Sequence, residues 1–172
     1  GLFGAYHRQA KQPADIEAMT RAIPERYRAS ILGGPGAALG RASHRLDFGS
    51  SEAKRGTRRA VAMGTVHNAD EVAARAGLAQ VPASPAELAI ALSEVGRQDA
   101  LAVANGLFCA AVYDEGGHRL ELITDRLASW PIHLWSENGE IVFAGAIRGL
   151  LADGRPRRLA APFGIAPRFT MQ

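Results

Sequence analysis

Residue types that commonly do chemistry are sparse in this sequence, and Cys109 is its single cysteine. One cysteine excludes an internal disulfide and any metal site built from several cysteines, and it is typical of a reducing compartment such as the cytoplasm. Cys109 lies within the apolar run Gly106 to Tyr113, where a cysteine is usually a small inert core residue rather than a nucleophile. The glycine-rich segment Gly33 to Gly36 is followed by neither Lys-Ser/Thr nor a clear helix, so it does not predict a phosphate-binding loop.

The composition indicates one compact domain. The chain has 172 residues, of which 47% are hydrophobic and 22% charged, so it can bury a sizeable core. No apolar run reaches the length of a membrane span, and the N-terminus lacks the basic-then-apolar pattern of a signal peptide, so we expect no membrane partner. The net charge of +3 is too small to indicate nucleic-acid binding, and we expect no nucleic-acid partner.

The stretch Asn105 to Leu151 predicts two consecutive hairpins followed by a short helix. Its apolar runs have strand length, and alternation with polar residues marks a half-buried strand. Asp114 to Gly117 supplies one turn, and Asn138-Gly139 supplies the other because both residues tolerate positive φ. The expected elements are strands over Gly106 to Tyr113, Leu120 to Thr124, Ile132 to Trp135 and Ile141 to Ala144, and a helix that ends at Leu151.

Turn and capping signals predict the remaining elements. Ser84-Pro85-Ala86-Glu87 is the clearest, a capping box with Pro at the first helical position. Gly1 to Tyr6 has the apolar character of a strand whose glycines indicate close backbone approach, but a frayed end is the simpler interpretation of these residues alone. The other expected elements are a helix over Pro13 to Ser30 broken at Pro24, a strand over Ala37 to Phe48, a mobile polar loop over Gly49 to Arg59, a strand over Ala60 to Val66, a helix capped by Asn68 or Asp70 and ending at Gly77, and a helical segment over Gln98 to Ala104.

This order of elements predicts an α+β fold in which helices cover two antiparallel sheets. Four segments, collinear over nearly the whole chain, also resemble class II glutamine amidotransferases, specifically the N-terminal domain of asparagine synthetase-like proteins. Gly1 to Gly4 is similar to the family's opening Cys-Gly-Ile-Phe-Gly without its Cys, Leu39 to Leu46 resembles Leu-Gly-His-x-Arg-Leu, and Met63 to Glu71 resembles Asn-Gly-Glu-Ile-Tyr-Asn-x-x-Glu. Within the hairpin stretch, 105–108, 124–133 and 143–151 resemble Gly-x-Phe-Ala, Arg-Asp-Arg-x-Gly-x-x-Pro-Leu-Tyr and Phe-Ala-Ser-Glu-Ile-Lys-x-Leu-Leu.

The resemblance implies an αββα sandwich of two antiparallel sheets, the N-terminal-nucleophile hydrolase architecture. In working members the N-terminal Cys attacks the side-chain amide of glutamine, and its own α-amino group, with a pKa of roughly 7.7–8, serves as the base. The ammonia reaches a C-terminal synthetase domain, where it attacks a carboxylate activated by ATP as an acyl-adenylate. We therefore expect an amidotransferase-like domain over residues 1–152 and, over 153–172, the lead-in to a synthetase domain that binds ATP and Mg²⁺ beyond Gln172.

The sequence departs from the family at the positions that hydrolyse glutamine. The nucleophile would precede Gly1, so no catalytic residue is assigned; loss of Met from a chain that starts Met-Gly is the simplest explanation. Met63 replaces an oxyanion-stabilising Asn, whose loss typically costs on the order of 10²–10³ in rate. We predict a vestigial, metal-free pocket that comprises Arg45, which matches the carboxylate-binding Arg, the retained Gly64, and Met63, Thr65 and Pro85, which replace the family's Asn, Glu and Asp.

Other departures lie outside that pocket. His67 and His133 occupy positions where the family has Tyr, and we interpret both as structural or partner-facing residues. Ala128 replaces a Gly, and Gly145-Ala146 replaces the family's Ser-Glu. These changes indicate that the face toward a synthetase domain has also diverged.

Three functions remain open. The first is a catalytically dead glutaminase-like domain of an ATP-dependent amide-forming enzyme, similar to the branch of β-lactam synthetases and lasso-peptide macrocyclases. Peptide macrocyclisation is favoured there, with the synthetase domain, a precursor peptide and a leader-peptide-binding protein as partners. The second is an active glutamine-hydrolysing domain of an asparagine synthetase whose Cys precedes Gly1. The third is a stand-alone scaffold module, against which the apolar end of the chain argues.

Overall fold

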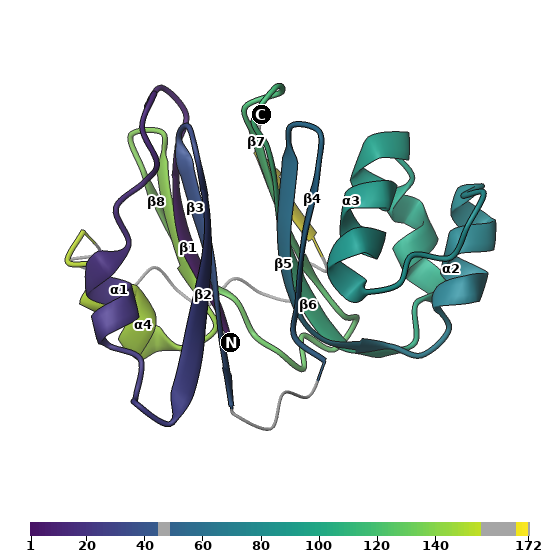
Figure 1. Cartoon of the computed structure of the whole chain (residues 1–172), viewed down its shortest axis with the longest axis horizontal. Helices are drawn as coiled ribbons and strands as arrows, with labels where there is room; N and C mark the ends of the chain where they lie inside the picture. The colour runs from purple at the N-terminus through teal and green to yellow at the C-terminus, as the bar shows by residue number, and fades with distance from the viewer. Residues whose placement is uncertain (45–48, 156–167, 172) are drawn as a thin grey trace.

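The computed structural model describes residues 1–44, 49–155 and 168–171, which form two antiparallel sheets packed face to face (Figure 1). Helices lie against the outer face of each sheet, so the layers run helix, sheet, sheet, helix. This arrangement confirms the αββα sandwich and the α+β class predicted from the sequence. In the described residues, no helix is both long and apolar enough to cross a membrane.

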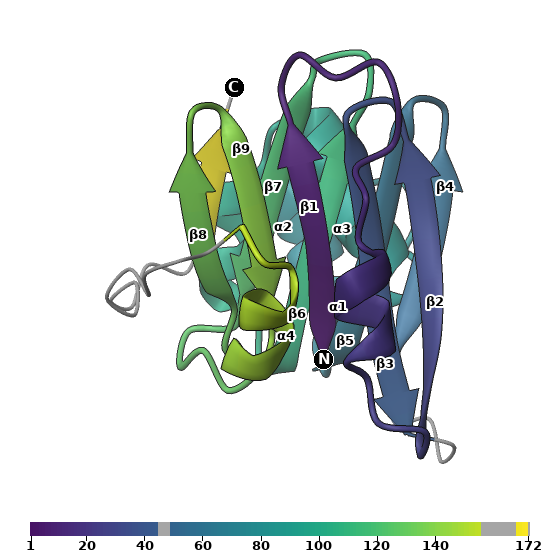
Figure 2. The same ribbon diagram turned by 90° about the vertical axis from the view of Figure 1, so that its left-hand side faces the viewer.

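The first sheet is organised around the N-terminal strand, with the order β2-β3-β1-β9-β8 (Figure 2). Its strands are β1 (Leu2–His7), β2 (Tyr27–Gly34), β3 (Ala37–His44), β8 (His133–Glu137) and β9 (Glu140–Ala144). β1 is buried and pairs with β3 on one side and β9 on the other, so the interpretation as a frayed end is wrong. The expected close approach occurs at Gly4, where a Cβ atom would lie 2.5 Å from both the Ala38 carbonyl oxygen and the Phe143 ring.

The second sheet has the order β10-β7-β6-β5-β4. Its strands are β4 (Ser51–Arg55), β5 (Arg58–Val66), β6 (Gly106–Asp114), β7 (Arg119–Thr124) and β10 (Arg168–Met171). The two hairpins predicted in Asn105 to Leu151 are confirmed, but they belong to different sheets: β6–β7 to the second and β8–β9 to the first. The segment 125–132 therefore carries the chain from one sheet to the other.

Two predicted elements differ from the structure. The helix expected over Pro13 to Ser30 is only α1 (Glu17–Arg21), and the chain then forms β2. Pro24 disfavours helical geometry at the residue before it, and every residue of β2 then pairs with a residue of β3. The polar loop expected over Gly49 to Arg59 is instead the β4–β5 hairpin. Its charged side chains are those of an edge strand, which commonly carries charge on its solvent side.

The helices cover the outer faces of the sheets. α1 and α4 (Ile147–Ala152) cover the first sheet, whereas α2 (Ala69–Ala76), α3 (Pro85–Val95) and the 3₁₀ helix η1 (Gln98–Val103) cover the second (Figures 1 and 2). The predicted cap of α3 is confirmed, because Ser84 Oγ accepts a hydrogen bond from the Glu87 amide at 3.2 Å. Asn68 precedes α2 as predicted, but its side chain accepts from the Asn105 amide at 2.7 Å instead of capping the helix.

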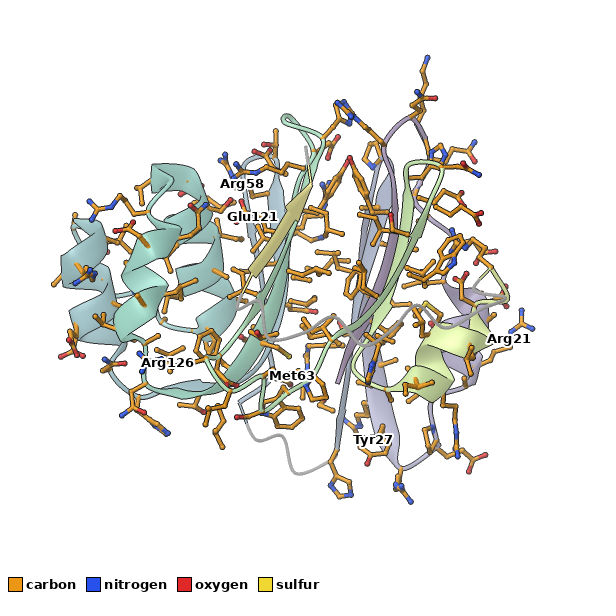
Figure 3. The ribbon with its side chains drawn as sticks, turned by 180° about the vertical axis from the view of Figure 1, so that it is seen from behind. Arg21, Tyr27, Arg58, Met63, Glu121 and Arg126 are labelled. Atoms are coloured by element: carbon orange, nitrogen blue, oxygen red, sulfur yellow. The ribbon has the colours of Figure 1, made fainter. Side chains whose placement is uncertain are left out.

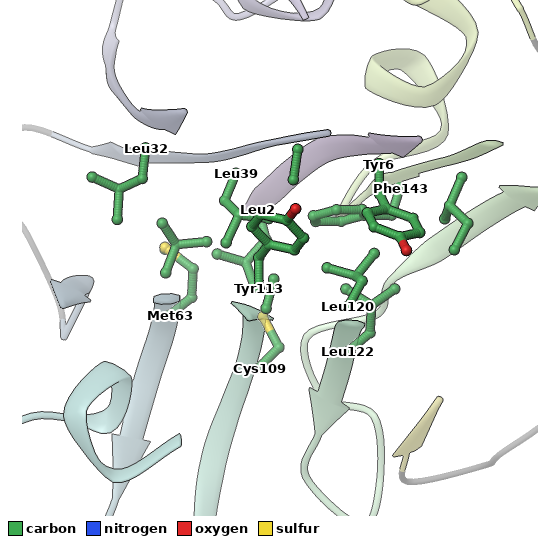
Figure 4. Packing of buried hydrophobic residues seen from close by; sticks show 14 residues of the cluster. Leu2, Tyr6, Leu32, Leu39, Met63, Cys109, Tyr113, Leu120, Leu122 and Phe143 are labelled. Atoms are coloured by element: carbon green, nitrogen blue, oxygen red, sulfur yellow. The ribbon is translucent and has the colours of Figure 1, made fainter. Parts of the chain in front are cut away.

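The main core lies between the sheets (Figure 4). Its buried members come from both layers: Leu2, Tyr6, Leu32, Ala37, Leu39, Ile141 and Phe143 from the first sheet, and Val61, Met63, Cys109, Ala111, Tyr113, Leu120 and Leu122 from the second. Burial of this apolar surface is the principal attraction between the sheets, at roughly 25 cal/mol per Å².

Two tyrosines join the sheets reciprocally. The Tyr6 hydroxyl, from the first sheet, donates to the His118 carbonyl oxygen in the β6–β7 turn at 2.6 Å. The Tyr113 hydroxyl, from the second, donates to the Pro35 carbonyl oxygen in the β2–β3 turn. Their rings are tilted against each other with centroids 5.9 Å apart, and burial raises the pKa of both hydroxyls. Both therefore act as protonated donors that set the spacing of the sheets at the end away from Gly1.

We predict that Tyr6→Phe and Tyr113→Phe each lower the free energy of unfolding by about 1 kcal/mol, because each removes a partly buried hydrogen bond between the sheets. Urea denaturation followed by circular dichroism measures this. Tyr27→Phe is the control, since no hydrogen bond involves its hydroxyl among the described residues. Equal stability of all three variants and the parent protein would contradict the tyrosine bridge.

Candidate functional site

The first residue of the chain is held at one end of the sandwich by backbone pairing on both sides. Gly1 N donates to the Ala42 carbonyl oxygen at 2.7 Å, and Gly1 O accepts from the Ala42 amide at 2.8 Å. On the other side, the Gly145 amide donates to Leu2 O at 2.6 Å. Gly145 lies so close that a Cβ atom there would be 3.3 Å from Gly1 Cα. Burial lowers the pKa of the Gly1 α-amino group.

A cavity of about 820 Å³ opens beside Gly1. It begins between the sheets and continues along α1 and α4 on the outside of the first sheet. Its walls are mostly apolar, and no Asp or Glu is among the described residues that line it. The lining consists of Gly1, Leu2, Phe3, Met19, Ala22, Ile23, Pro24, Arg26, Tyr27, Ala42, Ser43, His44, Met63, Cys109, Trp130, Pro131, Ala144, Gly145, Ala146, Arg148 and Gly149.

Met63 and Cys109 form the part of the wall contributed by the second sheet (Figures 3 and 4). They are register partners on β5 and β6, and both side chains point into the core between the sheets. Burial raises the pKa of the Cys109 thiol to about 12, and the nearby N-terminal ammonium lowers it only in part. The thiol is therefore protonated at neutral pH and is an inert core group, as its sequence context indicated.

Two glycines permit a very close approach of β5 and β6 at this end of the sheet. Gly64 has φ +89°, and a Cβ atom there would lie 1.9 Å from the Leu107 carbonyl oxygen. Gly106 has φ +155°, and a Cβ atom there would lie 2.1 Å from the Thr65 carbonyl oxygen. Any side chain at either position would separate the strands, so these glycines fix the backbone beside Met63.

The predicted vestigial pocket is only partly assembled in the described residues. Among them, Met63 alone lines the cavity, and Gly64 is buried next to it. Thr65 is exposed at the end of β5, and Pro85 is the first residue of α3, outside the cavity. Arg45 lies outside the described residues. His67 and His133 do not line the cavity either.

The sequence did not indicate a basic and aromatic rim on the cavity. The Arg26 guanidinium lies 5.2 Å from the centroid of the Tyr27 ring, a cation–π contact. Tyr27 is the cross-strand partner of His44, and the two rings meet edge to face with centroids 5.9 Å apart. Tyr27 lies at the foot of the first sheet in Figure 3. The rim was missed because Tyr27 was expected in a helix, where it would have no cross-strand partner.

A polar cluster behind the cavity wall was also missed. Arg41, on β3, donates to Ser43 Oγ at 3.3 Å and to Ser50 Oγ. Its Nε lies 3.7 Å from Glu52 Oε2, so its charge is balanced within the cluster. Ser43 lines the cavity, and the cluster therefore links β3 to β4 at this point. Arg41 lies four residues before Arg45, in the same segment that resembles the amidotransferase pattern.

Asp125 shapes the loop that brings Trp130 to the cavity. It is 5% exposed and accepts hydrogen bonds from the amides of Phe108 at 3.2 Å, Leu127 at 2.9 Å and Ser129 at 3.2 Å. Ala128, within the loop, adopts φ +49°, where glycine is favoured. A buried carboxylate thus holds the loop against β6. The signal for this role was the Asp of the Arg-Asp-Arg pattern, but its burial was not predictable from the pattern.

Two features bear on metal and nucleotide binding by the described residues. No group of three or more His, Cys, Asp or Glu side chains gathers in that part of the chain. The glycine-rich segment Gly33 to Gly36 lies at the turn between β2 and β3, not between a strand and a helix.

Comparison with known sequences identifies the family. Residues 50–152, more than half of the chain, match the family described as a glutamine amidotransferase domain. The chain belongs to this family. No curated protein matches the amidotransferase domain at the level of its sequence.

Solved structures share the fold of this amidotransferase domain. One is the glutamine phosphoribosylpyrophosphate amidotransferase from B. subtilis complexed with ADP and GMP, with a TM-score of 0.58 and 9% identity. Another is described as the allosteric regulatory enzyme of purine biosynthesis, with a TM-score of 0.57 and 11% identity. In both, the match covers 89% of this chain but 43% of the other. At such identities the likeness establishes the N-terminal-nucleophile hydrolase-like fold.

We predict that Asp125→Asn lowers the free energy of unfolding by about 1–3 kcal/mol, because an amide NH₂ would face backbone N–H groups in a buried place. Urea denaturation measures the loss. Glu137→Gln, at an exposed position on β8, is the matched control and should leave stability unchanged. If both variants lost the same small amount, Asp125 would not be organising the loop.

A second prediction concerns pH and Cys109. The folded pKa of the thiol, about 12, exceeds its ordinary value of 9.0, so the unfolded state releases the proton first and stability falls as pH rises above about 9. At pH 10 the loss from this group is about 1.4 kcal/mol relative to pH 7. The test compares the change in unfolding free energy between these pH values for the parent protein and Cys109→Ala. Equal changes in unfolding free energy for the two proteins would show that burial does not raise the pKa of the Cys109 thiol.

Proposed function

We propose that this amidotransferase domain no longer hydrolyses glutamine and serves as the N-terminal domain of an ATP-dependent, amide-forming enzyme of the asparagine synthetase type. Within that class, we favour peptide macrocyclisation through an acyl-adenylate. The amidotransferase-like part would be residues 1–152, and 153–172 would lead into the synthetase domain. That domain would supply ATP and Mg²⁺ binding, and a precursor peptide and a leader-peptide-binding protein would be the partners.

The observation that carries the proposal is the chemistry of the cavity beside Gly1. Glutamine hydrolysis by acyl transfer passes through an oxyanion that needs hydrogen-bond donors where the charge develops. Met63 occupies the wall there, and a thioether donates no hydrogen bond. The adjacent Cys109 thiol is buried and protonated, so it does not replace a nucleophile.

The backbone framework supports the same proposal. Gly64 and Gly106 still permit the close approach of β5 and β6, and Asp125 still holds its loop. A framework of this kind gives a synthetase domain a rigid surface to pack against. The framework is rigid whether or not glutamine is hydrolysed, because rigidity depends on packing and backbone pairing.

The proposal predicts that the purified full-length protein produces no glutamate or ammonia from glutamine. With Mg·ATP and a peptide that bears a side-chain carboxylate, it should release pyrophosphate without needing glutamine. Both products are measured in the same preparation by coupled enzyme assays. Pyrophosphate release that requires glutamine, with glutamate formed in equal amount, would contradict the proposal.

An active glutaminase whose Cys precedes Gly1 is the second candidate. The observation in its favour is the double backbone anchoring of Gly1, which would hold a preceding residue beside the cavity. N-terminal sequencing of the mature protein separates the two. Our proposal expects Gly as the first residue, whereas a terminal Cys together with glutamine hydrolysis would establish the alternative.

A further inference from the structure

The charges on the cavity beside Gly1 all have one sign. Arg26 lies between α1 and β2, and Arg148 lies on α4, whereas the described lining contains no carboxylate. Arg26 and Arg148 thus approach the mouth from two different elements. A mouth of this kind attracts an anion, because like charges that converge on an apolar wall raise the local potential.

Unlike Arg21, the rim residues Arg26 and Arg148 have no acidic partner among the described residues. Arg21, the last residue of α1, pairs with Glu17 at 2.8 Å and does not line the cavity. Its side chain points outward from the molecule in Figure 3. The rim therefore carries positive charge that the described side chains do not neutralise.

The interior of the cavity is apolar and of ligand size. Phe3, Met19, Ile23, Met63 and Trp130 contribute large hydrophobic surfaces to it. Its volume of about 820 Å³ lies in the usual range of small-molecule and peptide sites, roughly 300–1,000 Å³. An occupant complementary to the cavity is thus hydrophobic along its length and negatively charged where it meets the rim.

We propose that this cavity binds a short apolar peptide segment that carries a carboxylate, with its apolar side chains inside and the carboxylate between Arg26 and Arg148. This inference rests on the proposed function, since a working glutaminase would use the cavity for glutamine. The inference names a class of ligand for the cavity of a domain that no longer hydrolyses glutamine.

A peptide fits the wall better than an alkyl chain does. Small residues make up part of the cavity lining, among them Gly1, Ala42, Gly145, Ala146 and Gly149. Gly1 and Ala42 pair with each other, but the Gly145 carbonyl and the Ala146 amide, in an extended segment, have no hydrogen-bond partner among the described residues. An extended peptide has the groups to pair with them. A fatty acid has no such groups along its chain.

The test uses three probes and the full-length protein in isothermal titration calorimetry. The probes are N-acetyl-Leu-Phe-Leu-Glu-amide, its Gln counterpart and decanoate. The acidic peptide should bind about fivefold more tightly than the Gln peptide at low salt, and this advantage should shrink at 0.5 M NaCl. Arg26→Gln and Arg148→Gln should each weaken binding of the acidic peptide about threefold, and the double variant about tenfold.

Two further variants make the result specific. Arg21→Gln, on the same helix layer but outside the cavity, should bind the acidic peptide as the parent does. Ala146→Trp, at an exposed lining position, should obstruct the cavity and abolish binding while the thermal unfolding midpoint stays unchanged. The proposal is overturned if the two peptides bind equally, if neither binds, or if decanoate binds with the same dependence on Arg26 and Arg148.

The glutaminase assay is independent of this measurement. Glutamate production from glutamine would remove the proposed function, whatever the peptides do. Absence of glutamate together with absence of peptide binding would remove only the present inference. The two proposals therefore fail in distinguishable ways.

Discussion

The pairing of β1 with strands on both of its sides is the interaction on which the rest of the structure depends. Because β3 and β9 both bond to it, the N-terminal residues are the centre of the first sheet, and Gly1 is fixed at the sheet's end. The cavity lies where this end of β1 faces Met63 and Cys109 of the opposite sheet. Displacement of β1 would divide the first sheet and would also remove the part of the cavity wall that β1 forms.

The framework and the chemistry of the site are governed by different constraints. Gly64 and Gly106 are required by backbone distance, since any Cβ atom there would overlap a carbonyl group of the neighbouring strand. Asp125 is required because its carboxylate accepts hydrogen bonds from backbone amides of the loop and of β6. Met63 satisfies only packing, which many apolar side chains can do. A domain that keeps the fold can therefore lose hydrogen-bond donors from its cavity without losing stability.

Local sequence patterns predicted individual strands, turns and helix caps. The family resemblance predicted the order of the layers. Strands β6 to β9 followed from alternation and from turn dipeptides such as Asn138-Gly139, but their division between two sheets depends on long-range pairing. β4 was missed because its charges are those of an edge strand. Within the site, the resemblance pointed to Met63 and Gly64, whereas the contact of Tyr27 with His44 depends on strand register, which no local pattern contains.

The chain has the fold of a glutamine amidotransferase domain, and we propose that its cavity no longer hydrolyses glutamine. The most direct measurement is intact mass spectrometry of the full-length protein after incubation with 6-diazo-5-oxo-norleucine, an electrophilic glutamine analogue that alkylates a glutaminase nucleophile. The account predicts an unchanged mass, with Cys109 unmodified because its thiol is buried and protonated. Addition of one adduct at the N-terminal residue, prevented by excess glutamine, would contradict it.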